Sequence, residues 1–392
     1  MKITAVRTLV VNAEMRNWVF VRVETDQDGL WGWGEASLEW KTRNVIGAIQ
    51  DFEPMVVGED PRRIEHLYQK MYRQSFWRLG VIGMSAISGI EQACWDILGK
   101  SLGQPVYRLL GGAVRDRLRI YTHLGGGDMR AVYESQLSAD PKVFVDRALE
   151  VIDKGYTAVK VLITPPTESL NGIAAYRYAD RMMGALRSAV GEDVDIMIDC
   201  HGRHSLANAL EFCRILAPYR PYFVEEPAPP ENVDVLAEVR KASPVPIATG
   251  ERLVTRFEFR EVFEKQACHV IQPDLCHCGG LAEAKKIAAM AEAWYMGVAP
   301  HNPLGPVANA AALHFGLSTP NFLIQEDMLQ DVPWRWDVVR HTLETENGYW
   351  LPTEAPGLGV EVNETAALKH PFQQEVMHST TIRARDNAIL DW

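Results

Sequence analysis

The chain reads DIMID at residues 195–199, YFVEE at 222–226 and IATGE at 247–251, three short apolar runs that end in acidic residues. Asp199, Glu225 and Glu251 follow one another at steps of 26 residues. A step of this length holds one strand and one helix, so the runs predict neighbouring strands of a parallel sheet. The three carboxylates then lie together at the carboxyl ends of those strands.

The same alternation of short strand-like runs and longer helical patterns extends in both directions. It contains eight strand-like runs, at residues 119–124, 159–162, 194–199, 222–226, 247–251, 270–275, 296–301 and 321–326. Eight strand–helix units predict an α/β fold with a (β/α)8 barrel of the TIM type. A doubly wound sheet is disfavoured because it would give fewer units and because no GxGxxG loop follows a strand.

The segments on either side of the barrel pattern have a different character. Residues 1–115 begin with alternating apolar and polar residues and an Asp28-Gly29 hairpin signal, and they continue with helical patterns, which predicts an α+β domain. Gly111-Gly112 marks the end of this domain. We therefore assign residues 116–330 to the barrel and residues 331–392 to a C-terminal segment that returns to the first domain.

Composition argues against several classes of function. The 392 residues carry a formal net charge of −11 and contain no basic run, which disfavours binding to nucleic acid or to an anionic membrane. No apolar run approaches the ~18 residues of a membrane span, and the N-terminus lacks the apolar core of a signal peptide. Six cysteines in a chain of this length do not indicate a disulfide framework, so we expect a cytoplasmic protein. Cys276-His277-Cys278 is a poor zinc site because no second Cys/His pair lies at finger spacing.

The three acids at the strand ends predict a metal site. Carboxylates that converge from adjacent strands repel one another unless a cation lies between them. Oxygen ligands, with positions left for water and substrate, suit Mg²⁺ better than Zn²⁺. The alternative is three separate, solvated carboxylates, which is disfavoured because each acid ends an apolar run and active sites of barrels lie at the strand ends.

Further strand ends carry groups suited to proton transfer. His301 and Asp274 lie on neighbouring strand ends, and a carboxylate beside an imidazole raises its basicity, which predicts a general base. A core histidine bonded to a backbone carbonyl is the alternative. His201 follows Asp199 by two residues and should face the same way; it either binds the metal or acts as an acid, and we favour the acid. Glu326 either bonds a substrate oxygen in its protonated form or forms a structural ion pair, and we favour the first.

These residues resemble the mandelate racemase subgroup of the enolase superfamily, whose sites pair a lysine or histidine base with Mg²⁺. The resemblance covers essentially the whole chain, and within the subgroup it is strongest to D-galactonate and related aldonate dehydratases. Its most specific pieces are Asp199-Cys200-His201-Gly202-Arg203, Glu225-Glu226-Pro227, Gly250-Glu251-Arg252, Gln272-Pro273-Asp274 and APHNPLGP at residues 299–306.

The resemblance implies a fold, a cofactor and a reaction. Residues 1–115 would cap the barrel mouth, and one Mg²⁺ per subunit would be bound by Asp199, Glu225 and Glu251. His301 with Asp274 would be the base and His201 the acid, while Glu326 would polarise the substrate carboxylate. The expected reaction removes the C2 proton and the 3-hydroxyl of an acid sugar, such as galactonate or gluconate, to give a 2-keto-3-deoxy acid. A homo-oligomer, either a dimer or an octamer, is also implied.

Five residues are predicted to contact the substrate. Lys160 ends the second strand, and Arg203 either binds substrate or pairs with a neighbouring carboxylate. Arg16, Asn17 and Trp18 lie near a loop of the first domain that would close over the mouth, unless they form an exposed strand face.

Departures from the family pattern separate the alternatives. Racemases of the subgroup carry Lys-x-Lys on the second strand, and the match here is Lys160-Val161-Leu162. The second lysine is missing, so racemisation or epimerisation of a 2-hydroxy acid by two bases is disfavoured. Mannonate dehydratases of the subgroup have an Arg-Asn pair like Arg16-Asn17 but lack an aspartate matching Asp274. This difference disfavours a mannonate dehydratase, which stays as an alternative. A catalytically inactive regulatory homologue is disfavoured because the mouth residues are all present.

Overall fold

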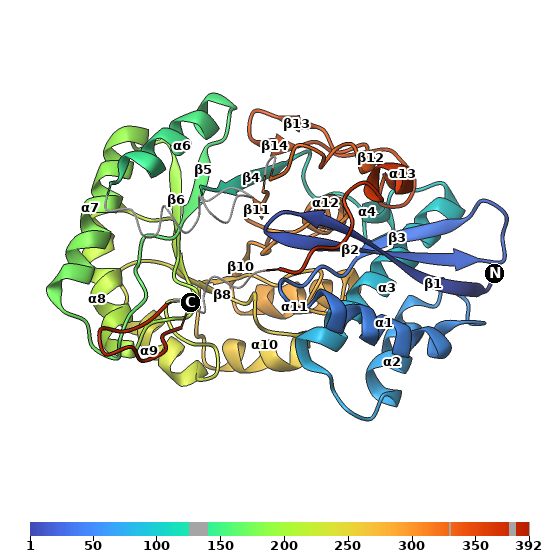
Figure 1. The fold of residues 1–392 in the computed structure, drawn as a ribbon, viewed down its shortest axis with the longest axis horizontal. Helices are drawn as coiled ribbons and strands as arrows, with labels where there is room; N and C mark the ends of the chain where they lie inside the picture. Colours follow the sequence, from blue (N-terminus) through green and yellow to red (C-terminus); the bar gives the residue numbers. More distant parts are fainter. Residues whose placement is uncertain (125–139, 329–330, 376–381, 392) are drawn as a thin grey trace.

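In this computed structural model of the chain, residues 1–124, 140–328, 331–375 and 382–391 are described. Figure 1 shows an N-terminal domain, in blue, packed beside a barrel whose helices are green, yellow and orange. Among the described residues, no helix combines the length and the apolar character that crossing a membrane requires.

The N-terminal domain is an antiparallel meander of three strands that packs against helices. Its strands pair in the order β1-β2-β3, and α3 crosses close to β3. The glycines of the β3 sequence WGWGE allow this approach, because a Cβ atom at Gly34 would lie 2.0 Å from the Gly89 carbonyl oxygen. The elements of this domain are β1 (Ile3–Ala13), β2 (Arg16–Thr25), β3 (Trp31–Glu35), α1 (Thr42–Val56), α2 (Ile64–Gln74), α3 (Gly80–Leu102) and the short α4 (Val106–Leu109).

Eight parallel strands close into the predicted barrel. Strands β4 to β10 pair in sequence order, β11 pairs in parallel with β4, and a bridge between Val298 and Phe322 closes the remaining gap. The strands are β4 (Leu118–His123), β5 (Ala158–Val161), β6 (Asp195–Asp199), β7 (Phe223–Glu225), β8 (Ile247–Thr249), β9 (Val270–Ile271), β10 (Gly297–Val298) and β11 (Gln325–Glu326).

A helix follows each of the first seven barrel strands. These helices are α6 (Lys142–Asp153), α7 (Ile173–Val190), α8 (Leu206–Leu216), α9 (Val233–Ala242), α10 (Thr255–Glu264), α11 (Leu281–Ala293) and α12 (Pro306–Leu317), and a 3-10 turn, η1 (Ala217–Tyr219), extends α8. After β11 the described chain continues into the C-terminal segment instead of an eighth barrel helix, which modifies the expected (β/α)8 pattern.

The barrel interior is filled by side chains. One buried residue from each strand, or from the position next to it, contributes to a single apolar cluster. Such a layer makes the barrel a packed core and leaves only its carboxyl end open for a site. The cluster consists of Tyr121, Ala158, Met197, Phe223, Ala248, Val270, Ala299 and Ile324.

The C-terminal segment contacts both domains. Strand β14 pairs with β4 of the barrel, and the backbone N–H of Asn12 in the N-terminal domain donates to the carbonyl of His370 at 2.8 Å. Figure 1 shows β12 and α13, in red, beside the N-terminal domain, and the described end of the chain, in dark red, beside the barrel near α9. Its elements are β12 (Val339–His341), β13 (Thr345–Glu346), β14 (Tyr349–Trp350), β15 (Val360–Val362) and α13 (Glu364–Ala367).

Two buried glutamates of the N-terminal domain bind the first N–H groups of barrel helices. Glu35 accepts hydrogen bonds from the backbone of Gly305 at 2.7 Å and of Ala308 at 2.9 Å, at the start of α12. Glu91 accepts from the first two N–H groups of α11, both at 2.8 Å. These N–H groups have no partner inside their helices and carry partial positive charge, so each carboxylate satisfies a helix end across the domain boundary.

We expect Glu91 to make stability depend on pH. Burial raises the pKa of Glu91 to about 7 although three N–H groups donate to it. A carboxyl group with a raised folded-state pKa stabilises the protein at low pH, and that contribution is lost as pH rises through the folded pKa. Glu91→Gln removes this titration. Between pH 5.5 and 8, wild type should lose about 2 kcal/mol of unfolding free energy relative to Glu91→Gln in urea titrations. A difference that is constant with pH would contradict this assignment.

Candidate active site

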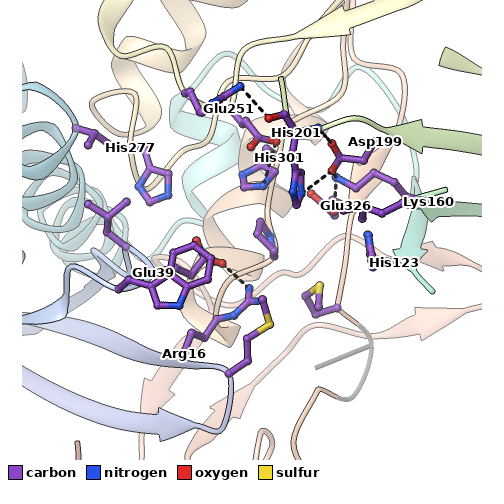
Figure 2. Close-up of a pocket in the computed structure, with 18 of the residues that line it drawn as sticks. Arg16, Glu39, His123, Lys160, Asp199, His201, Glu251, His277, His301 and Glu326 are labelled. Carbon is purple, nitrogen blue, oxygen red and sulfur yellow. Dashed lines mark hydrogen bonds and ion pairs between the residues drawn. The ribbon is translucent and has the colours of Figure 1, made fainter. Parts of the chain in front are cut away.

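A cavity of about 460 Å³ lies at the carboxyl ends of the barrel strands, under loops of the N-terminal domain. Figure 2 shows the barrel residues on one side of this cavity and Arg16 and Glu39 of the N-terminal domain on the other. The titratable residues that line it from the barrel are His123, Lys160, Asp199, His201, Glu251, Arg252, His277, His301 and Glu326.

Three acids from consecutive strands converge at this cavity. Asp199 and Glu225 are register partners on β6 and β7, and Glu251 follows β8. Each of the three offers an oxygen, and these oxygens all lie within 4.8 Å of one another. Gly250 has φ +143°, and a Cβ there would lie 2.9 Å from the Gln272 nitrogen, so glycine permits the turn that presents Glu251.

The carboxylates at this cavity outnumber the positively charged side chains beside them. The ammonium of Lys160 lies 3.4 Å from Asp199, 3.2 Å from Glu225 and 2.8 Å from Glu326. Burial and neighbouring carboxylates raise the pKa of Glu225 and of Glu251 well above the usual range. Burial acts in the same direction on Asp199, but His201 and Lys160 hold the pKa of Asp199 well below its usual value. One lysine therefore does not balance this group of carboxylates.

The donor set fits a divalent cation. Oxygen Oε2 of Glu251 is buried and has no hydrogen-bond partner among the described residues. Asp199 uses Oδ1 to accept from the backbone N–H of His201 at 3.0 Å, which orients the carboxylate. Three carboxylates with an unsatisfied oxygen are suitable ligands for a hard cation.

His301 and Asp274 form a hydrogen-bonded pair in the cavity. Nδ1 of His301 lies 2.8 Å from Oδ2 of Asp274, and Nε2 lies 3.5 Å from Oε2 of Glu251. Burial alone would lower the pKa of His301, but the bond to Asp274 and the charge of Glu326 raise it to about 9. The imidazole is thus oriented and made basic, with Nε2 directed toward the acidic triad.

His201 lies on the other side of the triad. It does not continue β6, because it sits in a turn with φ +51°. The alternation expected for a strand does not apply to it, yet the turn places its Nε2 3.5 Å from Oδ2 of Asp199. His201 and His301 therefore both line the cavity, His201 beside Asp199 and His301 beside Glu251.

Glu326 forms an ion pair, the alternative to the protonated donor favoured from the sequence. Its Oε1 pairs with Lys160, and its Oε2 accepts from the backbone N–H of Asn302 at 2.9 Å. Burial alone would raise its pKa, but Lys160 and His301 hold the pKa of Glu326 below its usual value. A carboxylate in this state cannot donate a hydrogen bond to substrate.

Three predicted substrate contacts do not line the cavity. Trp18 is fully buried in the core, where the Arg335 guanidinium lies 5.3 Å from its ring centroid. Asn17 donates to the Gln373 carbonyl at 2.8 Å and so holds the C-terminal segment. Arg203 donates to the carbonyls of Cys200 and Thr164 and braces the chain after β6. Their side chains are used in packing, so the structure does not bring these three residues to the cavity.

Arg16 and Lys160 do line the cavity, beside residues that sequence reasoning missed. The Arg16 guanidinium pairs with Glu39 at 3.2 Å at the edge formed by the N-terminal domain. His123 ends β4, and burial together with Lys160 lowers its pKa to about 3, so its ring is neutral. Its place at a strand end was the signal that could have identified it. The sequence offered no comparable signal for Glu39.

Comparison with protein families identifies the chain. Residues 3–111 match the mandelate racemase / muconate lactonizing enzyme N-terminal domain, and residues 143–366 match the enolase C-terminal domain-like family. The chain belongs to the mandelate racemase and muconate lactonizing enzyme family of the enolase superfamily.

Relatives of this family member match over nearly its whole length. It is 38% identical to a D-galactonate dehydratase of Verminephrobacter eiseniae, with 100% of both chains covered, and 38% identical to one of Ralstonia nicotianae, with 96% of both covered. Among solved structures, a mandelate racemase/muconate lactonizing enzyme from Sulfitobacter sp. superposes with a TM-score of 0.88 at 36% identity, covering 96% of this chain and 97% of that one. A member of the enolase superfamily from Salmonella Typhimurium gives 0.86 at 32% identity, covering 94% and 98%.

Proposed function

We propose that this family member is a Mg²⁺-dependent dehydratase of an aldonic acid, such as galactonate or gluconate, that gives a 2-keto-3-deoxy acid. The chain is an enzyme of the hydro-lyase class, as its full-length relatives named D-galactonate dehydratase indicate. The observation that carries the proposal is the placement of two histidines at the acidic triad: Nε2 of His201 lies 3.5 Å from Asp199, and Nε2 of His301 lies 3.5 Å from Glu251. Dehydration requires one group that removes a proton and another that delivers one.

Asp199, Glu225 and Glu251 would hold the Mg²⁺ ion. A divalent cation in this position supplies positive charge to a substrate carboxylate and so makes the neighbouring C–H bond more acidic. Lys160 places a second positive charge beside Asp199 and Glu225. Glu326 anchors that ammonium and accepts from the backbone after His301, so it orders the site as an ion-pair partner.

His301 is the base in this proposal. Because Asp274 accepts from Nδ1, the free position of the neutral ring is Nε2, which faces the triad and the cavity. It takes the proton from C2 of the substrate, and the resulting imidazolium is stabilised by Asp274. The hydrogen bond from Nδ1–H to Asp274 keeps this tautomer.

His201 is the acid. Hydroxide is a poor leaving group, so the 3-hydroxyl departs as water when Nε2 of His201 delivers a proton to it. The electron pair left by the C2 proton forms the C2–C3 double bond, and the enol that results tautomerises to the 2-keto product. Leu162 lines the cavity at the place where racemases of the family carry a second basic residue, which disfavours racemisation.

The direct test is a screen of acid sugars with Mg²⁺ present, in which 2-keto acids are detected as semicarbazones. We expect at least one aldonate to give a semicarbazide-reactive product, and a chelator should abolish the reaction. A racemase or epimerase would return a 2-hydroxy acid with inverted configuration and no such product. If no acid sugar yields a keto acid and 2-hydroxy acids are inverted instead, the dehydratase assignment is wrong.

Mg²⁺ binding should weaken as pH falls. Burial and neighbouring carboxylates raise the pKa values of Glu225 and Glu251, so a falling pH favours the protonated forms in the metal-free protein, and a metal must displace those protons. In the metal-free protein the protonated carboxyls contribute to the free energy of unfolding, and this contribution is lost as pH rises through their folded-state pKa. Mg²⁺ offsets this loss, so the rise in melting temperature on adding Mg²⁺ should be larger at pH 8 than at pH 6.

The control for this measurement is Glu251→Gln, which removes one ligand charge while keeping the side-chain shape. We expect this variant to show little stabilisation by Mg²⁺ at either pH, because two carboxylates and an amide bind the ion much less tightly. An equal stabilisation of wild type at both pH values would show that the triad is already ionised without metal.

A further inference from the structure

Asp274 lies in the loop that joins β9 to α11, and this loop is fastened to one face of α3. The side-chain amide of Gln92 donates to the Leu275 carbonyl at 3.0 Å, and the Ser88 hydroxyl accepts from the Gly279 N–H at 3.0 Å. Ser88 and Gln92 are four positions apart and therefore share a helix face. The N-terminal domain thus fixes the loop that carries the partner of the base.

His277 lies between this helix face and Asp274. Its Nδ1 is 3.0 Å from the Ser85 hydroxyl oxygen, and its Nε2 is 3.5 Å from Oδ2 of Asp274. Ser85 already donates its hydroxyl proton to the Val81 carbonyl at 2.8 Å, so its oxygen accepts from Nδ1–H of His277. The ring is buried and lines the cavity, and its other nitrogen faces a carboxylate.

Asp274 is held from several directions. Its Oδ1 accepts from the backbone N–H of Cys276 at 2.7 Å, and its Oδ2 faces the two imidazoles of His301 and His277. Rotation of the carboxylate would break the bond to His301, because the second oxygen is already used by the backbone. A second donor to Oδ2 resists that rotation. Nε2 of His277 lies 3.5 Å from this oxygen and donates to it when the ring is an imidazolium, in which both ring nitrogens carry protons.

We propose that His277 is a positioning residue for the base: it holds the Asp274 carboxylate against His301 and ties this pair to α3 through Ser85. The contacts form one chain from the N-terminal domain to the reacting histidine, through Ser85, His277 and Asp274. This inference rests on the proposed function, because it assigns His277 a role in a reaction in which His301 is the base. His277 acts through Asp274 and needs no contact with substrate.

The test compares two substitutions that each keep one nitrogen of the ring. In His277→Gln the amide nitrogen can take the place of Nε2, which faces Asp274; in His277→Asn it can take the place of Nδ1, which faces Ser85. We expect His277→Gln to retain more of kcat than His277→Asn. His277→Asn should lower kcat by about tenfold to a hundredfold, because small displacements of a catalytic group have effects of this size, while KM changes less than twofold.

A second measurement needs no turnover. The Nδ1–H proton of His301, bonded to Asp274, should give a far-downfield proton NMR signal in the full-length Mg²⁺-loaded protein, assigned by its absence in His301→Asn. We expect this signal to be kept in His277→Gln and to be shifted or lost in His277→Asn. If no acid sugar is dehydrated, the proposed function fails, and this signal alone still decides the role of His277.

Ser88→Ala is the matched control, since it removes a hydroxyl that holds the same loop from the same helix without contacting His277. It should change kcat and the signal much less than His277→Asn does. The proposal is overturned if His277→Asn matches wild type, if only its KM changes, or if Ser88→Ala reproduces its loss of kcat. Should both His277 variants fail to fold, Ser85→Ala replaces them: a smaller fall in kcat with a shifted signal supports the proposal, and no change in either refutes it.

Discussion

Replacing His301 with asparagine is expected to abolish both the dehydration of an aldonate and the exchange of its C2 hydrogen with solvent deuterium. Asparagine cannot take up a proton at neutral pH, so the first step of the reaction has no base. A positioned general base contributes roughly 10²- to 10⁴-fold to the rate, and we expect kcat to fall by at least the upper part of this range. Proton NMR in D₂O measures exchange, and the semicarbazone assay measures product.

Two controls separate loss of the base from loss of the fold. Mg²⁺ should still raise the melting temperature of His301→Asn, because its three carboxylate ligands are intact. His66→Asn changes a half-exposed histidine on the N-terminal domain and should leave kcat unchanged. Exchange at the wild-type rate in His301→Asn would show that another group removes the proton, and the assignment of His301 would have to be abandoned.

Replacing His201 with asparagine should separate the two halves of the reaction. We expect dehydration to fall by roughly 10²- to 10⁴-fold, the contribution of a positioned acid, while C2-hydrogen exchange continues at a rate close to that of wild type. Exchange persists because His301 and Asp274 lie on the other flank of the triad and are untouched. Asparagine suits this position since His201 has φ +51°, a conformation that asparagine adopts more readily than most residues.

Together the two variants separate C2-hydrogen exchange from dehydration. His301→Asn loses exchange and dehydration, whereas His201→Asn loses dehydration alone. A His201→Asn enzyme that dehydrates at the full rate would exclude His201 as the acid. A variant that loses exchange as well as Mg²⁺-dependent stabilisation would instead identify His201 as a metal ligand, the alternative left open by its position beside Asp199.

Local pattern predicted the barrel and its acids because both depend on periodicity. Each strand–helix unit has nearly the same length, and parallel strands point in the same direction, so Asp199, Glu225 and Glu251 converge whatever the details of the loops. The same logic applies to His301 and Asp274, which follow neighbouring strands. These inferences required no knowledge of how distant segments pack.

The structure departs from expectation at positions where long-range packing decides where a side chain lies. Trp18 follows the β1–β2 turn that presents Arg16 to the cavity, and only the three-dimensional packing shows that its side chain enters the core. Arg203 is adjacent to the site in sequence, yet backbone carbonyls take its donors. The state of Glu326 depends on Lys160, which lies on a strand that is distant in sequence. A single sequence does not display such pairings.

The glutamates that span the domain boundary have a consequence for chimeras built to change substrate preference. Exchanging the whole N-terminal domain for that of a relative would expose the amino ends of α11 and α12 unless the donor supplies acids equivalent to Glu35 and Glu91. Grafting only residues 14–16 and 38–41 leaves both acids in place. Such a graft changes residues that line the cavity while the hydrogen bonds between the two domains stay intact.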